Sequence, residues 1–354
     1  MKKFLLLPVL AALLLLFSGC PYGYRYDEGN FPYDPVNLEL ANSIYDDYNM
    51  TAPVIEGRRY LYFSSNRNSS GNDYDIVGSH FHILWDKEEG TLTVDDSPDT
   101  WKNMEYVDIL FSMMNTDSNE YGPYSLSWNG YEGPDACYTD LVIYSNDEAG
   151  NQDIRLVYFK GAGAYPAPED GFFEGPEPVS VLNSEHNDAY LSFYGPYFIQ
   201  NDWGSDPSVI TEVLFCSDRD GDFDVYRAEV PADSSILDFL LSEDHVAIKS
   251  VDIINSTSQD KCPYTDGELL VFASDRPGGF GGFDLYYSRR NGDTWSEPVN
   301  FGQRVNSEYN EYRPVIMMFY EFQNDLMLFS SDRPGGKGGY DLYYVGIAKM
   351  IEGK

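Results

Sequence analysis

The strongest constraint on the fold is a sequence repeat in the C-terminal half of the chain. Residues 272–287 and 329–344 share an apolar run, Ser-Asp-Arg-Pro-Gly-Gly, a second glycine pair and then Asp-Leu-Tyr-Tyr, and they lie 57 residues apart. A third copy at residues 215–226 precedes them by the same interval. A fixed internal period of this size is typical of arrays and propellers, in which each unit packs on its neighbours.

Each copy is predicted to form a β-hairpin. An apolar run, a Ser-Asp or Ser-Asn turn and a second apolar run are the pattern of two short strands joined by a turn. Asp and Asn hydrogen-bond nearby backbone, and glycine supplies positive φ. Two weaker copies at residues 62–76 and 143–154 lack the glycine pairs, so the pattern predicts five units.

A second signature precedes each hairpin, in which Asn-Ser or Asn-Thr is followed by a carboxylate five positions after the Asn. The pairs are Asn42 and Asp47, Asn115 and Glu120, Asn183 and Asp188, Asn255 and Asp260, and Asn306 and Glu311. Four strands per unit and five units predict a single all-β propeller of five four-stranded blades. Six blades is the alternative, because residues 78–114 leave room for extra strands.

The N-terminal part of the repeat region is predicted to close the ring. Pro35-Val36-Asn37-Leu38 precedes Asn42 as Pro298-Val299-Asn300-Phe301 precedes Asn306. The later segment should be the outer strand of the previous blade. For the N-terminal copy that blade is the last one, so pairing there would remove an open sheet edge.

The Ser-Asp-Arg…Gly-Gly…Asp-Leu-Tyr-Tyr pattern resembles the WD40-like PD40 repeat of TolB-type propellers, especially the glycine-rich form in lipoproteins of Bacteroidetes-type bacteria. The resemblance covers about residues 35–345 and is most specific in the last two units. It implies a propeller attached to the cell envelope.

The first residues are predicted to be a lipoprotein signal. Lys2 and Lys3 precede an apolar run that ends in Phe17-Ser18-Gly19-Cys20. The run is too short to cross a membrane comfortably and is typical of a secretory signal. It resembles a lipobox with Cys20 as the acylated residue. We expect a signal peptide at 1–19, a flexible tether at 20–34, the propeller at 35–347 and a tail at 348–354. Pro21 after the cysteine favours the outer membrane, on its periplasmic or external side.

Charge restricts the partners. The chain has 58 Asp and Glu against 23 Lys and Arg, a formal net charge of -35. Nucleic acid and anionic lipid surfaces are therefore excluded as partners, because both are bound by clustered Lys and Arg. The expected partner is a protein or glycan of the envelope, with membrane attachment through the lipid alone.

The sequence contains few motifs that are typical of catalytic or metal sites. No His-Glu-x-x-His, phosphate loop or Gly-x-Ser-x-Gly is present, so no catalytic residue, metal site or cofactor is assigned. Alternating acids at Asp218–Asp224 are similar to a calcium loop, but Phe223 stands where such a loop needs glycine; turn formation is the preferred interpretation. Cys137, Cys216 and Cys262 leave the disulfide pairing open. Trp85, Trp101 and Trp128 fall in non-repeated segments and are weaker candidates for sugar stacking than for the core.

The five repeated acids, Asp47, Glu120, Asp188, Asp260 and Glu311, are the candidate site. They should circle one mouth of the channel, either accepting hydrogen bonds that fix the blades or forming a ligand or cation site in which crowding raises a pKa. Two functions are considered. A non-enzymatic binding or scaffold propeller is favoured because these acids obey the repeat symmetry, and a glycoside hydrolase or lyase using carboxylates at the mouth is the alternative.

Overall fold

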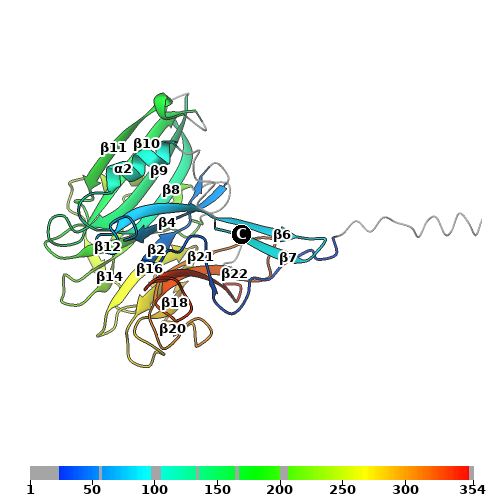
Figure 1. Cartoon of the computed structure of the whole chain (residues 1–354). Helices are drawn as coiled ribbons and strands as arrows, with labels where there is room; N and C mark the ends of the chain where they lie inside the picture. Colours follow the sequence, from blue (N-terminus) through cyan, green and yellow to red (C-terminus); the bar gives the residue numbers. More distant parts are fainter. Residues whose placement is uncertain are drawn as a thin grey trace, which may run out of the picture.

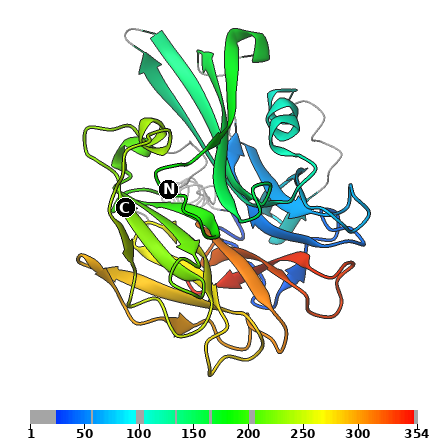
Figure 2. The same cartoon turned by 90° about the vertical axis from the view of Figure 1, so that its left-hand side faces the viewer.

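Every repeated carboxylate is the first residue of an inner strand. The inner strands are β2 (Asp47–Thr51), β8 (Glu120–Glu132), β12 (Asp188–Tyr194), β16 (Asp260–Asp266) and β21 (Glu311–Met317). Each contacts the next, and β21 contacts β2, so the ring closes after five blades, as predicted (Figure 2). The computed structural model describes residues 24–55, 58–96, 105–132, 135–163, 167–199 and 206–350.

Three blades have four antiparallel strands in simple order. Blade 2 consists of β8, β9 (Asp135–Asn146), β10 (Asp153–Ala162) and β11 (Gly171–Pro178). Blade 3 consists of β12, β13 (Glu212–Ser217), β14 (Asp224–Glu229) and β15 (Ile248–Ser250). Blade 5 consists of β21, β22 (Asp325–Ser331), β23 (Asp341–Ile347) and β1 (Val36–Asn37).

Blade 4 has two short outer strands. It consists of β16, β17 (Leu269–Ser274), β18 (Asp284–Asn291), β19 (Thr294–Trp295) and β20 (Val299–Asn300). Short helical segments lie in connections of the other blades: η2 (Pro168–Asp170) in blade 2, and η3 (Pro207–Val209) and α3 (Ile236–Leu240) in blade 3.

Blade 1 departs from the pattern where the sequence spacing was longest. It consists of β2, β3 (Val54–Ile55), β4 (Arg58–Ser65) and β5 (Asp75–His80). A separate hairpin of β6 (His82–Asp86) and β7 (Thr91–Asp95) follows and projects from the ring in Figure 1. Helix α2 (Glu105–Met114) then packs against β5 of blade 1 and against β10 and β11 of blade 2. The extra length therefore forms a hairpin and a helix, not a sixth blade.

The N-terminal strand closes the propeller, as predicted. In β1, Val36 pairs with Tyr344 and Asn37 pairs with Tyr343 of β23. In Figure 2 the blue N-terminal segment accordingly lies beside the red C-terminal strand. Because β1 covers the edge of β23, blade 5 has four strands, the same number as blades 2 and 3.

The signature asparagines join each blade to the one before it. Each asparagine side chain binds one residue in the third strand of the preceding blade. Its Oδ1 accepts the backbone N–H of that residue, and its Nδ2 donates to the backbone C=O of the same residue. The pairs are Asn42 with Leu342, Asn115 with Ile76, Asn183 with Ile154, Asn255 with Val225, and Asn306 with Leu285. The amide acts as one more residue of an outer strand, which explains why asparagine recurs.

The paired glycines are needed for close packing between blades. Gly281 and Gly338 lie directly against backbone carbonyls of the next blade, those of Tyr309 and Tyr45, and a Cβ at either position would overlap them. Gly278 and Gly335 have φ near +100°, which favours glycine. These glycines therefore belong to the architecture, as the hairpin interpretation predicted.

Residues of the predicted tether contact the face on which the inner strands end, which we call the lower face. Gly29 exchanges backbone hydrogen bonds with Glu321 and Gln323 in the β21–β22 connection. Phe31 is fully buried and stacks on Phe322 with ring centroids 3.9 Å apart. Within the described ranges no helix has both the length and the apolar character that a membrane crossing requires.

Candidate functional site

The structure places all five predicted carboxylates at equivalent positions on the face where the inner strands begin, which we call the upper face. All five are fully buried. Each accepts the backbone N–H of the residue four positions earlier, which is Ser43, Thr116, Ser184, Ser256 or Ser307. Each carboxylate therefore closes the loop that leads into its own inner strand.

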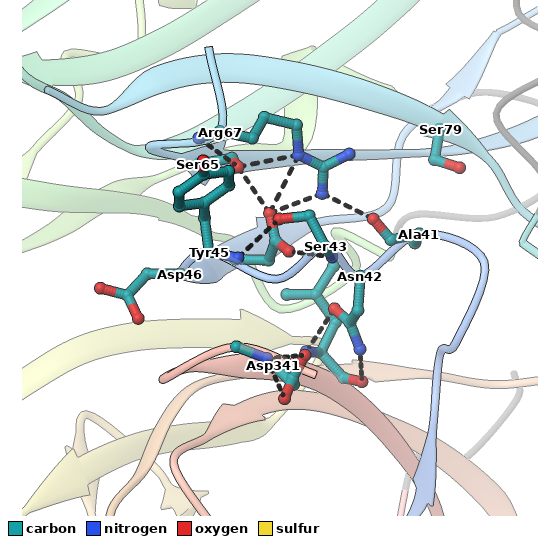
Figure 3. A network of polar contacts seen from close by, with 12 residues as sticks. Ala41, Asn42, Ser43, Tyr45, Asp46, Ser65, Arg67, Ser79 and Asp341 are labelled. Carbon is teal, nitrogen blue, oxygen red and sulfur yellow. Dashed lines mark hydrogen bonds and ion pairs between the residues drawn. The ribbon is translucent and has the colours of Figure 1, made fainter. Parts of the chain in front are cut away.

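Four of the five carboxylates also pair with the arginine of the Ser-Asp-Arg or Ser-Asn-Arg turn. In blade 1, Arg67 Nη2 lies 2.5 Å from Asp47 Oδ1 and also donates to the carbonyl of Ala41 (Figure 3). The equivalent pairs are Arg219 with Asp188, Arg276 with Asp260, and Arg333 with Glu311. This geometry matches the structural interpretation of the repeated acids, because every one of these charges is compensated inside its own blade.

Glu120 is the exception. The arginine position of blade 2 is occupied by Glu148, and Glu120 instead accepts hydrogen bonds from the Thr116 hydroxyl and the Asn146 amide, both at 2.7 Å. Burial raises the pKa of Glu120 to about 7. A raised pKa for one member was predicted, but its main cause is desolvation and not crowding by the other acids.

A second ring of side chains joins neighbouring blades on the upper face. The residue before each inner strand accepts a backbone N–H from the start of the preceding blade's third strand. The acceptors are Asp46, Asn119, Asn187, Gln259 and Asn310, and the donors are Tyr340, Tyr74, Gln152, Phe223 and Phe283. Four of these acceptors are amides, and only Asp46 is a carboxylate.

Asp46 therefore breaks the repeat symmetry and has an additional role. Its Oδ1 accepts the Tyr340 N–H at 3.0 Å, as the amides do in other blades. Its Oδ2 accepts the Tyr74 hydroxyl at 2.8 Å. Sequence reasoning missed Asp46, although aligning the five repeats shows an acid where the other blades have Asn or Gln.

Seven half-buried aromatic side chains and one lysine lie around the propeller axis on the upper face, and we call them the mouth cluster. Its members are Tyr48, Tyr74, Tyr121, Phe223, Lys261, Phe283, Tyr312 and Tyr340. The ring centroids of Tyr48 and Tyr74 lie 4.9 Å apart, and those of Tyr74 and Tyr121 lie 5.6 Å apart. Across the cluster, Lys261 Nζ lies 3.9 Å from the centroid of the Phe223 ring.

Two carboxylates flank the tyrosine side of the mouth cluster. Asp46 accepts from Tyr74, and the carboxylate of Asp147 lies near the Tyr121 hydroxyl and raises its pKa. Burial and the adjacent carboxylates raise the pKa of both tyrosines, so both hydroxyls remain protonated. Blade 1 and blade 2 thus present a platform of aromatic rings between two acids.

The remaining predicted residues lie away from the mouth cluster. Trp85 donates to the carbonyl of Tyr26 on the lower face, and Trp128 packs partly buried against the core. Cys137, Cys216 and Cys262 are free thiols. Among the described residues no group of three His, Cys, Asp or Glu side chains is arranged to hold a metal ion, and this includes Asp218–Asp224. Cys20 and Trp101 lie outside the described residues.

Comparison with solved structures shows the same fold. An endo-arabinase from Bacteroides thetaiotaomicron is 12% identical with a TM-score of 0.51, and the alignment covers 90% of this chain and 99% of the enzyme. A second structure, described as a glycoside hydrolase, is 8% identical with a TM-score of 0.50 and covers 92% of this chain and 95% of its own. No protein-family profile matches the chain, and no curated protein matches it.

These comparisons correct two predictions. The expectation of a non-enzymatic binding or scaffold protein is wrong, because the solved propellers similar to this chain are described as an endo-arabinase and a glycoside hydrolase. The propeller expected from the PD40 resemblance is present, but these neighbours are glycoside hydrolase propellers and not TolB-type ones.

Proposed function

We propose that the chain is a carbohydrate-active enzyme that cleaves a glycosidic bond at the mouth cluster. The observation that carries the proposal is Asp46, the one carboxylate in a ring of otherwise amide side chains, placed beside aromatic rings on the upper face. An acid that breaks repeat symmetry serves something other than the repeat. The described activities of the solved propellers support the same class of reaction.

The mouth cluster has the parts that a sugar site requires. Glycoside hydrolysis uses two carboxyl groups on either side of the scissile bond, one donating a proton and the other acting as base or nucleophile. Asp46 and Asp147 are assigned these positions because they flank Tyr74 and Tyr121. The tyrosine rings would stack on the sugar, and their hydroxyls would exchange a carboxylate partner for a sugar hydroxyl.

Electrostatics restricts the substrate to a neutral glycan. The chain carries a net charge of -35, and both assigned acids lie at the mouth cluster. A strongly negative surface repels uronic acids and sulfated sugars as they approach. Neutral pentose or hexose chains meet no such barrier.

The proposed location is the outer membrane, through acylation of Cys20. Residues 24–34 contact the lower face, opposite the mouth cluster. A lipid attached upstream would therefore hold the enzyme with its mouth cluster facing away from the membrane. Changing Cys20 to Ala should move the protein to the soluble fraction and remove the acyl mass from its N-terminus, and unchanged partitioning would refute the anchor.

The function is tested by release of reducing ends from a panel of neutral and acidic polysaccharides. Asp46→Asn introduces the residue type of the other blades and keeps an acceptor for the Tyr340 N–H, so it should fold normally and lose at least about 100-fold in kcat. Asp147→Asn should behave alike. The matched control is Asp218→Asn, the equivalent of Asp147 in blade 3, which contacts Asn187 and no mouth tyrosine. Equal activity of Asp46→Asn and wild type would refute the assignment.

A further inference from the structure

The third residues of the five inner strands form another ring around the axis. They are Asn49, Gly122, Tyr190, Cys262 and Arg313, all with φ between 48° and 58°. Each inner strand has a register irregularity at this point, which is a β-bulge that redirects a side chain. Within this ring Arg313 is the only charged residue.

Arg313 is fully buried and poorly compensated. Its Nη2 donates to the carbonyl of Pro123 at 3.3 Å. In the described part of the chain, Nε and Nη1 have no hydrogen-bond partner, and no ion pair between a carboxylate and this guanidinium is formed. Arginine does not lose its proton in proteins. A buried cation without a counter-charge costs several kcal/mol, so a fold that keeps one needs compensation from elsewhere.

The neighbours of Arg313 do not supply a negative charge. The guanidinium carbon lies 5.5 Å from the centre of the Tyr190 ring, and Cys216 and Cys262 are close by. Burial raises the pKa of Tyr190 well above its usual value and that of Cys262 to about 12. Both groups are therefore neutral at physiological pH.

One neighbour offers a further donor. The Tyr190 hydroxyl accepts from Asn49 Nδ2 at 3.2 Å, which leaves its own hydrogen to be donated. Packing around it is tight, because a Cβ on Gly122 would overlap the Tyr190 ring. The Arg313 guanidinium and the Tyr190 hydroxyl thus provide unused donors in a buried and confined place.

We propose that Arg313 binds a small inorganic anion of chloride size on the propeller axis, with Nε, Nη1 and the Tyr190 hydroxyl as donors. The anion neutralises the guanidinium and stabilises the junction of blades 2, 3 and 5. Tight packing excludes larger anions such as phosphate or sulfate. This site is independent of the proposed enzymatic activity and lies inside the ring.

The test measures the melting temperature of the full chain during titration with sodium chloride, with sodium gluconate holding the ionic strength constant. Wild type should gain about 3 °C or more in a saturable manner. Arg313→Met should lose this response and should melt no lower than wild type in gluconate, because the uncompensated charge is gone. Arg67→Met, which removes a carboxylate-paired arginine, should keep the response.

A crystal grown in sodium bromide gives a second readout that needs no variant. An anomalous peak within hydrogen-bond distance of Arg313 Nε or Nη1 would confirm the site even if Arg313→Met fails to fold. A wild-type melting temperature that is equal in chloride and gluconate, together with no bromide peak at Arg313, would overturn the proposal.

Discussion

Asp46 contacts Asn66 with the acid before the inner strand and the amide in the turn, whereas the other blades have the amide before the inner strand and the acid in the turn. Asn66 Oδ1 accepts the backbone N–H of Asp46 at 2.9 Å. In blade 2 the equivalent contact has the carboxylate on the turn, where Asp147 accepts both the N–H and the side-chain amide of Asn119. The exchange places a carboxylate on the mouth side while the backbone contact is kept.

The double substitution Asp46→Asn with Asn66→Asp tests whether this exchange serves function. It should create the side-chain hydrogen bond present in blade 2 and raise the free energy of unfolding by about 1 kcal/mol. Hydrolysis should be lost. Urea denaturation and the reducing-end assay measure the two effects, and a variant that is less stable but fully active would contradict the account.

The buried ion pairs between the turn arginines and the repeated carboxylates should be important for stability. Arg276→Met leaves the fully buried Asp260 without its counter-charge, and we expect a loss of about 3–5 kcal/mol in the free energy of unfolding. The control is Lys249→Met, which breaks an exposed pair with Glu229 and should cost less than about 1 kcal/mol. Similar losses of unfolding free energy in both variants would mean that the Arg276–Asp260 pair is no stronger than a surface ion pair.

Glu120 should make stability decrease as pH rises. Its pKa is about 7 in the folded protein and about 4.3 when unfolded, so between these values the folded state binds more protons. Its contribution is complete below about pH 4 and is lost progressively up to about pH 7. Relative to Glu120→Gln, wild type should lose about 3 kcal/mol across this window. A constant difference between the two proteins at all pH values would contradict the assignment.

The Asn42 contacts should contribute to ring closure. Asn42→Ala removes two hydrogen bonds to the Leu342 backbone, which is left partly unpaired at a buried site, and should cost about 2 kcal/mol. Asn68→Ala, which removes an exposed contact with Asp75, is the control. Urea denaturation compares the two, and equal stability would show that β1 alone holds the ring together.

Much of the fold could be predicted because the repeat carries its own geometry. The Asn signature, the carboxylate and the Ser-Asp-Arg turn recur at fixed spacing, and each residue makes the same contact in its blade, so five blades and closure by Val36–Asn37 followed from spacing alone. Hairpin β6–β7 and helix α2 could not be predicted, since residues 78–114 have no counterpart in the other units.

The site was harder to predict for a physical reason. Asp47 and its equivalents attract attention because they recur, but recurrence reflects a packing role that every blade shares. The informative residues are those that differ between blades: Asp46, Glu148 and Arg313. Asp46 and Arg313 are important through their contacts with Tyr74 and Tyr190, and Glu148 is important because it stands where an arginine would pair with Glu120. These relationships join parts of the chain that only the folded ring brings together.

The most direct test of the central claim is a crystal structure of the Asp46→Asn variant soaked with an oligosaccharide that the wild-type protein hydrolyses. A sugar ring should stack on Tyr48, Tyr74 or Tyr121, with the glycosidic oxygen between the substituted side chain and the carboxylate of Asp147. A sugar bound elsewhere on the propeller, or a wild-type protein that releases no reducing ends from any glycan of the panel, would contradict it.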